Sequence, residues 1–397
     1  MLRGCFSSIY SLGNKKNVVS TILVGNAFVW YYAVLNALTS ITPSIPLWVW
    51  FLHFSGLIVS ALVGASFGRR FDRSKFLIVW LIMGIVSSAT FSALDGASLV
   101  LVGLVSLFLG LTLGFGMPAC MSYFSDSVAI ESRGRVSGVT MLGSGIGIAV
   151  FGSLLGTDPF LIGMVLAVWR LIGLSVFLWA KDYRRIERQE VEPSYKQIFR
   201  QQHFTLYFMP WLMFSLVNYF AVPMMPDRTL QIVQTVFMGA SAVVGGVFVD
   251  SLGRKRIAIA GFAMLGLGSA VLGFSGNPIP YVIRCFNAVM DGVAWGFLLV
   301  LFILTLWGDL SHFRSSDKYY ALGVMPFFAS KLLELSVGDL AVRILSSSAL
   351  FSFAAFFLFL AVLPLVYAPE TLPEKVIKKR ELTLYVEKAQ EIAEKYY

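Results

Sequence analysis

The chain has 397 residues, of which 57% are hydrophobic and only 13% are charged. Soluble domains carry about 25% charged residues, so this composition excludes an ordinary soluble protein and indicates a membrane protein. The net charge of +9 does not indicate nucleic-acid binding, because the Lys and Arg residues lie in short clusters between apolar runs. We expect their partner to be the lipid bilayer with its anionic headgroups.

Twelve apolar stretches follow one another along the chain, each near the roughly 20 residues that a membrane helix needs. The eleventh is interrupted by Lys331 and Glu334. None alternates apolar and polar residues with a period of two, which excludes an outer-membrane barrel. The predicted fold is therefore all-α and polytopic, with twelve transmembrane helices. They cover residues 18–41, 46–67, 76–94, 98–124, 136–155, 160–180, 204–222, 230–249, 257–274, 281–306, 319–340 and 349–367.

The basic residues orient these helices. With the amino terminus in the cytoplasm, all but five of the 31 Lys and Arg residues fall on the cytoplasmic side. Both termini are therefore predicted to be cytoplasmic, and the protein is expected in the plasma membrane. The five exceptions are Arg170, Arg228, Arg284, Lys331 and Arg343.

A long charged segment divides the spans into two sets of six. Residues 1–180 form the first predicted half, 181–203 a cytoplasmic linker, 204–368 the second half and 369–397 a cytoplasmic tail. Within the linker, Pro193-Ser194 is a typical helix start. In the tail, Leu382, Val386 and Ala389 share one helical face, which predicts an amphipathic helix on the membrane surface.

Residues recur between the two halves at a nearly constant offset. One pair of glycines could recur by chance, but three pairs near one offset indicate a six-plus-six duplication, a known design of membrane transporters. The pairs are Asn36 with Asn218 and Gly64 with Gly246, each 182 positions apart, and Gly138 with Gly323, 185 apart.

The loop after the eighth span carries the motif GxxxDxxGRK, which begins at Gly246 and ends at Lys255. This motif, in a short loop between two membrane spans, resembles the signature of the major facilitator superfamily. The loop from Glu131 to Arg135 and the segment Pro369-Glu370-Thr371 are also similar to that family, the latter to its sugar-porter branch. The first-half copy departs from the signature, with Gly68 in place of Asp and Phe71 in place of the second Gly. The resemblance covers essentially the whole chain and implies a secondary transporter of two six-helix halves.

The resemblance also implies that these loops form a conformational latch. The latch is expected to hold the cytoplasmic ends of the halves together while a central cavity faces outward. A carboxylate at a helix end can cap a neighbouring helix or pair with arginine. The alternative is that the loops only anchor the helices, which leaves the glycines unexplained. The expected latch residues are Arg133, Arg135, Gly246, Asp250, Gly253, Arg254 and Lys255.

Polar residues within the spans are costly in a bilayer and are therefore candidate functional residues. The resemblance implies that spans one, four, seven and ten line the cavity, and three of these carry polar residues on one helical face. The expected pathway residues are Tyr32 and Asn36 on span one, Trp211 and Asn218 on span seven, and Arg284, Asn287, Asp291 and Trp295 on span ten.

Three other charged residues lie within spans. Lys331 and Glu334, three positions apart on span eleven, either neutralise each other or take part in the pathway. Arg170 lies on span six, which the resemblance places at the edge of the bundle. We expect Arg170 to pack there or to snorkel toward the headgroups.

The charges of span ten have no counterpart around residues 100–109 of the first half, which indicates a single asymmetric site. We expect Asp291 to accept a coupling proton, because desolvation favours its neutral form, and Arg284 to contact an anionic group of the solute. The structural alternative keeps Asp291 ionised against Lys331 on the adjacent span.

The predicted function is secondary active transport of a small polar solute, such as a sugar or an organic acid, by proton-coupled symport. The alternatives are a proton-coupled efflux antiporter, a membrane receptor that transports nothing, and an intramembrane enzyme. The sequence contains no phosphate-binding loop and no HExxH or GxSxG motif, and its cysteines and histidines lack metal-ligand spacing. We expect no enzyme activity, no metal and no other cofactor, and a monomeric protein.

Overall fold

The computed structural model describes residues 15–41, 45–68, 72–154, 156–180, 193–221, 227–276, 278–311, 316–344, 346–372, 382 and 386. Most of the predicted linker and of the predicted amphipathic tail lies outside these residues. In the part that is described, every regular element is a helix. The helices are α2 (Lys15–Ile41), α3 (Leu47–Phe67), α4 (Arg73–Ala89) with the 3-10 turn η1 (Thr90–Leu94), α5 (Leu99–Ser127), α6 (Arg133–Leu154), α7 (Pro159–Ala180), α8 (Tyr195–Arg200), α9 (Gln202–Ala221), α10 (Arg228–Ser251), α11 (Arg254–Phe274), α12 (Tyr281–Leu299), the π turn η3 (Val300–Thr305), α13 (Leu306–Leu310), α14 (Asp317–Ile344), α15 (Ser347–Leu360) and α16 (Val362–Tyr367).

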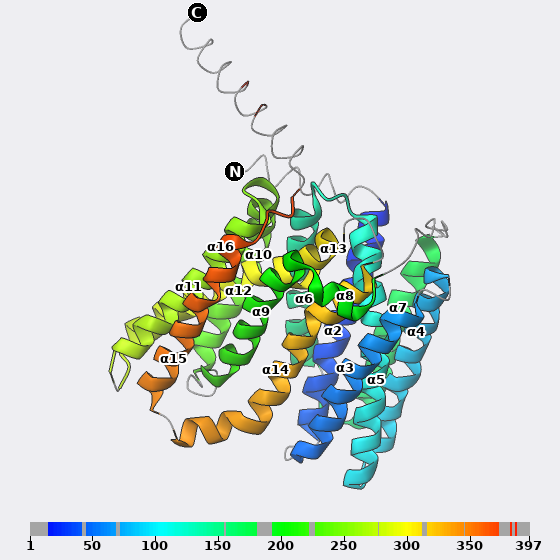
Figure 1. The fold of residues 1–397 in the computed structure, drawn as a ribbon. Coiled ribbons are helices and arrows are strands. Elements are labelled where there is room, and N and C mark those ends of the chain that lie inside the picture. Colours follow the sequence, from blue (N-terminus) through cyan, green and yellow to red (C-terminus); the bar gives the residue numbers. More distant parts are fainter. Residues whose placement is uncertain are drawn as a thin grey trace, which may run out of the picture.

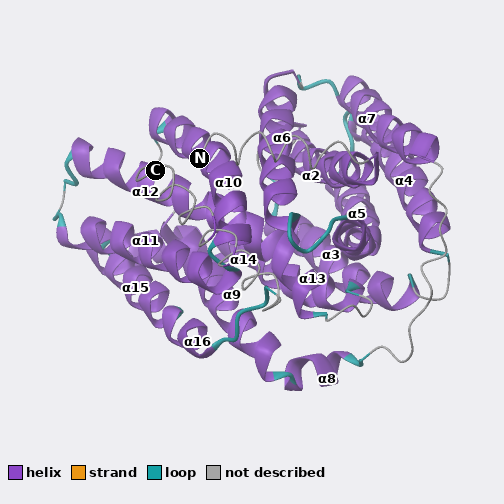
Figure 2. Cartoon of the chain, turned by 90° about the horizontal axis from the view of Figure 1, so that it is seen from above, coloured by secondary structure: helices purple, strands orange, loops and turns teal. Residues whose placement is uncertain are grey.

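The helices form two bundles that stand side by side (Figures 1 and 2). Helices α2–α7 form the N half, and α9–α16 form the C half. In the N half α3 packs along α5, and in the C half α10 packs along α12. The halves meet mainly along two seams, where α6 lies against α10 and α3 lies against α14. One hydrophobic core extends through both halves, and two helix pairs make most of the contact between them.

Ten helices, some continued by a turn or a short helix, are long and apolar enough to cross a membrane. They coincide with ten of the predicted spans, and the chain is a multi-pass membrane protein. Helices α9 and α14 occupy the predicted seventh and eleventh spans but are not among the ten. Because Lys331 and Glu334 lie within α14, its hydropathy is low for a spanning helix. The count of twelve stays a prediction.

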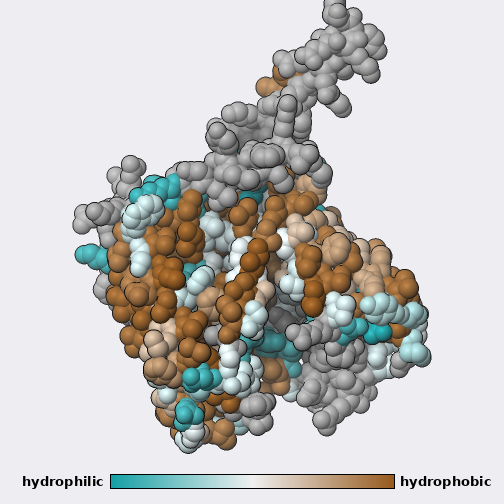
Figure 3. Space-filling model, turned by 180° about the vertical axis from the view of Figure 1, so that it is seen from behind, coloured by the Kyte–Doolittle hydropathy of each residue, from teal (hydrophilic) through white to brown (hydrophobic). Residues whose placement is uncertain are grey.

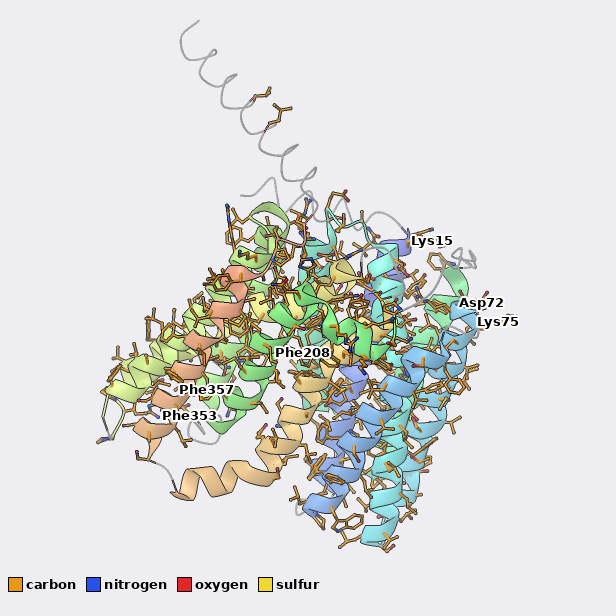
Figure 4. All side chains as sticks on the ribbon, in the orientation of Figure 1. Lys15, Asp72, Lys75, Phe208, Phe353 and Phe357 are labelled. Carbon is orange, nitrogen blue, oxygen red and sulfur yellow. The ribbon has the colours of Figure 1, made fainter. Side chains whose placement is uncertain are left out.

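The outer faces of both halves are apolar. Hydrophobic side chains, drawn brown, cover the sides of the molecule in Figure 3. Figure 4 shows Phe353 and Phe357 on α15, at the outer side of the C half. Phe274 and Phe356 are 87% and 62% exposed. Helices satisfy their backbone hydrogen bonds internally, so such a surface can face lipid.

Short polar side chains begin several helices. Asp72 accepts hydrogen bonds from the backbone N–H groups of Ser74 and Lys75 at the start of α4. Ser194 caps α8 in a reciprocal capping box with Gln197, which confirms the predicted helix start. The π turn η3 carries the α12 helix on to Leu310, beyond its predicted end at residue 306.

Candidate functional site

Asp250 lies near the end of α10 and reaches across the seam to the start of α6. Its carboxylate accepts hydrogen bonds from the backbone N–H groups of Gly134 at 2.8 Å and Arg135 at 2.9 Å. The side chain of Arg135 donates to it through Nε at 3.2 Å, and Arg254 Nη1 lies 3.4 Å away. The first N–H groups of a helix have no partner within the helix and attract negative charge. A carboxylate of the C half therefore caps a helix of the N half.

A second carboxylate, that of Asp309 on α13, lies between arginines of the two halves. Arg254 of the C half donates to it from Nε at 2.9 Å, and Arg133 of the N half pairs with it through Nη1. Arg254 Nη2 also donates to the carbonyl oxygen of Ile130 in the N half, at 2.7 Å. The side chains of Arg254 and Asp309 have no exposed surface. Buried charges need partners, so this network joins the halves; we call its end of the molecule the latch end and the opposite end the open end.

Glycines allow α6 and α10 to approach closely at the latch end. A Cβ atom on Gly246 would overlap the backbone of Gly134, and one on Gly138 would overlap that of Ala242. Seven residues after Gly138, on the same face of α6, a Cβ on Gly145 would meet no atom within 4 Å. The seam is therefore closed at the latch end and separates beyond it. Figure 3 shows the surface hollowed between the halves at the open end, which is the lower one in that view.

Gly253 and Lys255, both expected in the latch, contact the end of the C half instead. Gly253 has a φ of 102°, which favours glycine, and faces the carboxylate of Glu370. Glu370 accepts hydrogen bonds from the backbone N–H groups of Arg254 at 2.8 Å and Lys255 at 3.2 Å, and so caps α11. Lys255 Nζ donates to the carbonyl oxygen of Val366 at 2.7 Å. For these two residues the structure favours the anchoring alternative.

One ion pair joins α14 directly to the N half, and a second connection runs through α8. Arg73 Nη2, at the start of α4, lies 3.5 Å from the carboxylate of Asp317. The short helix α8 bridges the same seam, because the Tyr195 hydroxyl donates to the carbonyl oxygen of Leu62 at 2.5 Å while Lys318 Nζ lies over its ring. The second seam is thus also held at the latch end.

The expected polar face of α12 divides among different neighbours. Gln234 Nε2 of α10 donates to the carboxylate of Asp291, which is partly exposed. Asn287 faces α11. Arg284 lies in the first turn of α12, with its guanidinium 5.4 Å from the Tyr281 ring. Arg284 therefore lies near the end of its span, three residues after the helix start, and its contact with an anionic group of the solute stays a prediction.

A cluster of buried aromatic rings lies between Asp291 and the latch end. Trp211 of α9 stacks on Phe302, with ring centroids 4.8 Å apart and planes 4° from parallel, and it also stacks on Phe327. Phe327 contacts Phe328, whose ring meets Tyr31 of the N half at 5.5 Å. All five rings are buried. We call these five residues the aromatic cluster, and the contact of Phe328 with Tyr31 joins it to the N half.

The remaining pathway residues surround this cluster. Trp295 joins it through Phe214, at a centroid distance of 4.8 Å. On α2, Tyr32 is partly buried and Asn36 is exposed. Asn218 lies on α9, and its side chain is outside the described atoms.

Two buried polar atoms lie on α9, one of them in the aromatic cluster. The Trp211 Nε1–H group and the Ser215 hydroxyl find no hydrogen-bond partner among the described residues. Buried polar groups are nearly always paired, so such atoms point to a missing partner.

Lys331 and Glu334 pair with each other on α14, at a distance of 2.7 Å between Nζ and Oε2. The self-neutralising pair is therefore present. A part in the pathway stays a prediction for both residues, as does the latch role for the residues at the latch end.

Solved structures of a known transporter share this architecture. The structure of the major facilitator superfamily proton:xylose symporter XylE bound to 6-bromo-6-deoxy-D-glucose matches with a TM-score of 0.69 and 14% sequence identity, covering 92% of this chain and 97% of that one. A double-tryptophan variant of XylE matches with a TM-score of 0.71 and 14% identity, covering 94% and 99%. The chain has the major facilitator fold. No family model and no curated protein matches the sequence.

Sequence analysis missed several residues that this major facilitator fold brings together. Asp309 follows an apolar span in the tetrapeptide Trp-Gly-Asp-Leu, which belongs to no motif. A carboxylate at the predicted cytoplasmic end of a span, facing loops rich in arginine, was the available signal. Gln234 carries no charge, so the cost of ionisable groups in a bilayer did not single it out within span eight. Glu370 was noted only as part of a family motif, and its capping role could not be derived from spacing.

Proposed function

We propose that the protein is a proton-coupled symporter that carries a small polar solute across the plasma membrane by alternating access. Two halves that are sealed at one end and separated at the other fit one end state of such a cycle. The proposal assigns the latch end and both termini to the cytoplasm, so this state is outward-facing. It also assigns twelve spans and a monomer.

Sugars are the first solute class to test. The fold is shared with a protein described as a xylose symporter and solved with a glucose analogue. Aromatic rings pack against the C–H faces of sugars, and the unpartnered groups of Trp211 and Ser215 fit hydroxyl groups of such a solute. Tyr32 and Asn36 extend the polar surface along α2.

The observation that carries the proton coupling is the pairing of Asp291 with the neutral side chain of Gln234. An amide offers both a donor and an acceptor, so Gln234 can satisfy the carboxylate and, after reorientation, the protonated acid. An arginine or lysine partner would instead hold Asp291 in its ionised form. Asp291 is thus suited to take up and release a proton in each cycle.

The first prediction tests this role with Asp291→Asn in proteoliposomes. We expect the variant to lose accumulation of D-xylose or D-glucose driven by a proton gradient, because it cannot carry the proton. Exchange of labelled for unlabelled sugar should persist, since exchange needs no net proton movement. Asp158→Asn, a change at an exposed carboxylate, is the matched control and should behave like the unchanged protein.

Three outcomes would contradict the proposal in different ways. Full gradient-driven uptake by a stable Asp291→Asn protein would remove Asp291 from coupling. Proton flux opposite to solute flux would make the protein an antiporter. No flux of any solute with the unchanged protein would favour a receptor.

A further inference from the structure

A buried arginine in the N half belongs neither to the latch nor to the pathway. Arg170 of α7 has no exposed surface, so of the two expected roles it packs and does not snorkel. Its guanidinium lies over the rings of Trp30, at 5.0 Å, and Trp80, at 4.4 Å. A buried charge is expensive, and an apolar side chain of similar volume would often be more stable there. Packing alone therefore does not explain why this position is an arginine.

Hydrogen bonds from this arginine lead to α2. Arg170 Nη1 donates to Asn26 Oδ1 at 2.9 Å. Asn26 Nδ2 donates to the carbonyl oxygen of Trp169 at 2.6 Å, and the Trp169 indole N–H returns a bond to the carbonyl oxygen of Asn26 at 3.0 Å. Three hydrogen bonds thus join two adjacent residues of α7 to a single residue of α2.

The surrounding helices are shaped to admit this group. A Cβ atom on Gly84 of α4 would overlap Arg170 Nε, and one on Gly173 of α7 would overlap the Asn26 amide. The Trp30 indole N–H donates to Ser88 Oγ of α4 at 2.7 Å. Nε and Nη2 of Arg170 have no partner among the described residues. The Arg170 guanidinium therefore lies between α2 and α4, in room left by the glycines. Among the described residues, no carboxylate forms an ion pair with it.

The geometry of α2 connects this group to the pathway. Asn26, Trp30 and Ala33 share one helical face, at spacings of four and seven residues, and Ala33 is 2% exposed. Tyr32 and Asn36 lie on a different face of the same helix. We propose that Arg170 is a positioning residue for the pathway: by holding Asn26 it sets the rotation of α2 and thereby directs Tyr32 and Asn36 into the hollow. The pathway part of this proposal rests on the proposed function.

The test measures the rotation of α2 without any transported solute. Single cysteines at Asn36 and Ala33 are labelled with a water-soluble maleimide in proteoliposomes, and labelling of the parent protein is subtracted. In the parent background we expect Asn36→Cys to react about tenfold or more faster than Ala33→Cys, because only position 36 is exposed. Arg170→Met and Asn26→Leu should each reduce this ratio to about threefold or less. Arg170→Lys should preserve it, since an ammonium can still lie over the tryptophans and donate to Asn26.

His53→Leu is the matched control. His53 is a buried polar residue of the same half, and its hydrogen bond, from Nδ1 to the carbonyl oxygen of Ser106 at 2.9 Å, leads to α5 and not to α2. The His53→Leu variant should have a lower melting temperature, and the ratio of Asn36→Cys to Ala33→Cys labelling should not change. If Ala33→Cys stays protected in Arg170→Met and only the melting temperature falls, Arg170 is a packing residue and the proposal is overturned. If Arg170→Met does not fold, the Asn26→Leu variant decides: continued protection of Ala33→Cys from labelling in that variant also overturns the proposal. Absence of transport in the parent would count against the proposed function alone.

Discussion

Asp250 and Asp72 lie in the two copies of the loop motif, although Gly68 and not Asp72 takes the position of Asp250, and they make different contacts. Asp250 caps a helix of the opposite half, whereas Asp72 caps only the helix that follows it. Figure 4 shows Asp72 at the outer edge of the N half, beside Lys75. We expect Asp250→Asn to lower the turnover of transport, because loss of a charge-assisted contact of about 1–3 kcal/mol shifts the balance between end states. The apparent affinity for solute should change little. Asp72→Asn should stay within about twofold of the parent rate, because asparagine is an equally good N-cap. Equal losses of turnover in the two variants would contradict this asymmetry.

Asp309 shows how much one residue of the latch end is expected to contribute to stability. Removing its charge leaves Arg133 and Arg254 buried without their shared carboxylate. We expect Asp309→Asn to destabilise the protein by about 3–5 kcal/mol, the usual effect of breaking a buried ion pair from one side. Thermal unfolding in detergent measures the change. Asp126→Asn is the control, since that carboxylate is 33% exposed in its pair with Arg73 and should matter less. An unchanged melting temperature for Asp309→Asn would show that the network does not hold the halves together.

At the scale of elements, the seam between α6 and α10 depends on small residues. Gly138 has no room for a side chain against α10, whereas a Cβ on Gly143, on the opposite face of α6, would meet nothing within 4 Å. We expect Gly138→Val to separate the two helices, to lower the melting temperature by several degrees and to reduce transport. Gly143→Val should retain both properties. If both variants behaved alike, close approach of α6 and α10 would not be a requirement of the seam.

The helices could be predicted from the sequence far better than their contacts. Each membrane helix must satisfy its own backbone hydrogen bonds, so an apolar run of sufficient length is almost enough to define it. Contacts depend on rotation and depth: Asn287 lies only 60° around the helix from Arg284, yet it faces α11. The start of the helix that carries Arg284 was predicted at residue 281 and is observed there, whereas the neighbours of Arg284 were not predictable. Asp250 could be identified because it lies in a motif of the resembled family. Asp309 lies in no motif, so the sequence around it did not indicate its contacts.

At the scale of the whole molecule, the two ends differ in what holds them. The latch end is joined by buried ion pairs, helix caps and the bridging helix α8, all within the described residues. At the open end the seam separates at Gly145, and the surface is hollowed there (Figure 3). The proposed rocking motion of the halves would exchange these conditions, so it requires the contacts of the latch end to break in every cycle. Contacts worth a few kcal/mol each suit that purpose, because they bias the two states without trapping one of them.

The orientation of the molecule in the membrane is the prediction that the whole argument requires. Arg256, at the start of α11, is exposed at the latch end, while Asp95 and Ala349 are exposed at the open end. If the latch end is cytoplasmic, an impermeant maleimide added to intact cells should label Asp95→Cys and Ala349→Cys, and Arg256→Cys only after permeabilisation. Labelling of Ala349→Cys also tests whether α14 crosses the membrane, because that residue follows α14 and precedes the last span. The reverse pattern at positions 95 and 256 would invert the topology and make the observed state inward-facing. A cytoplasmic Ala349→Cys beside an external Asp95→Cys would remove α14 from the spans and reduce the count below twelve.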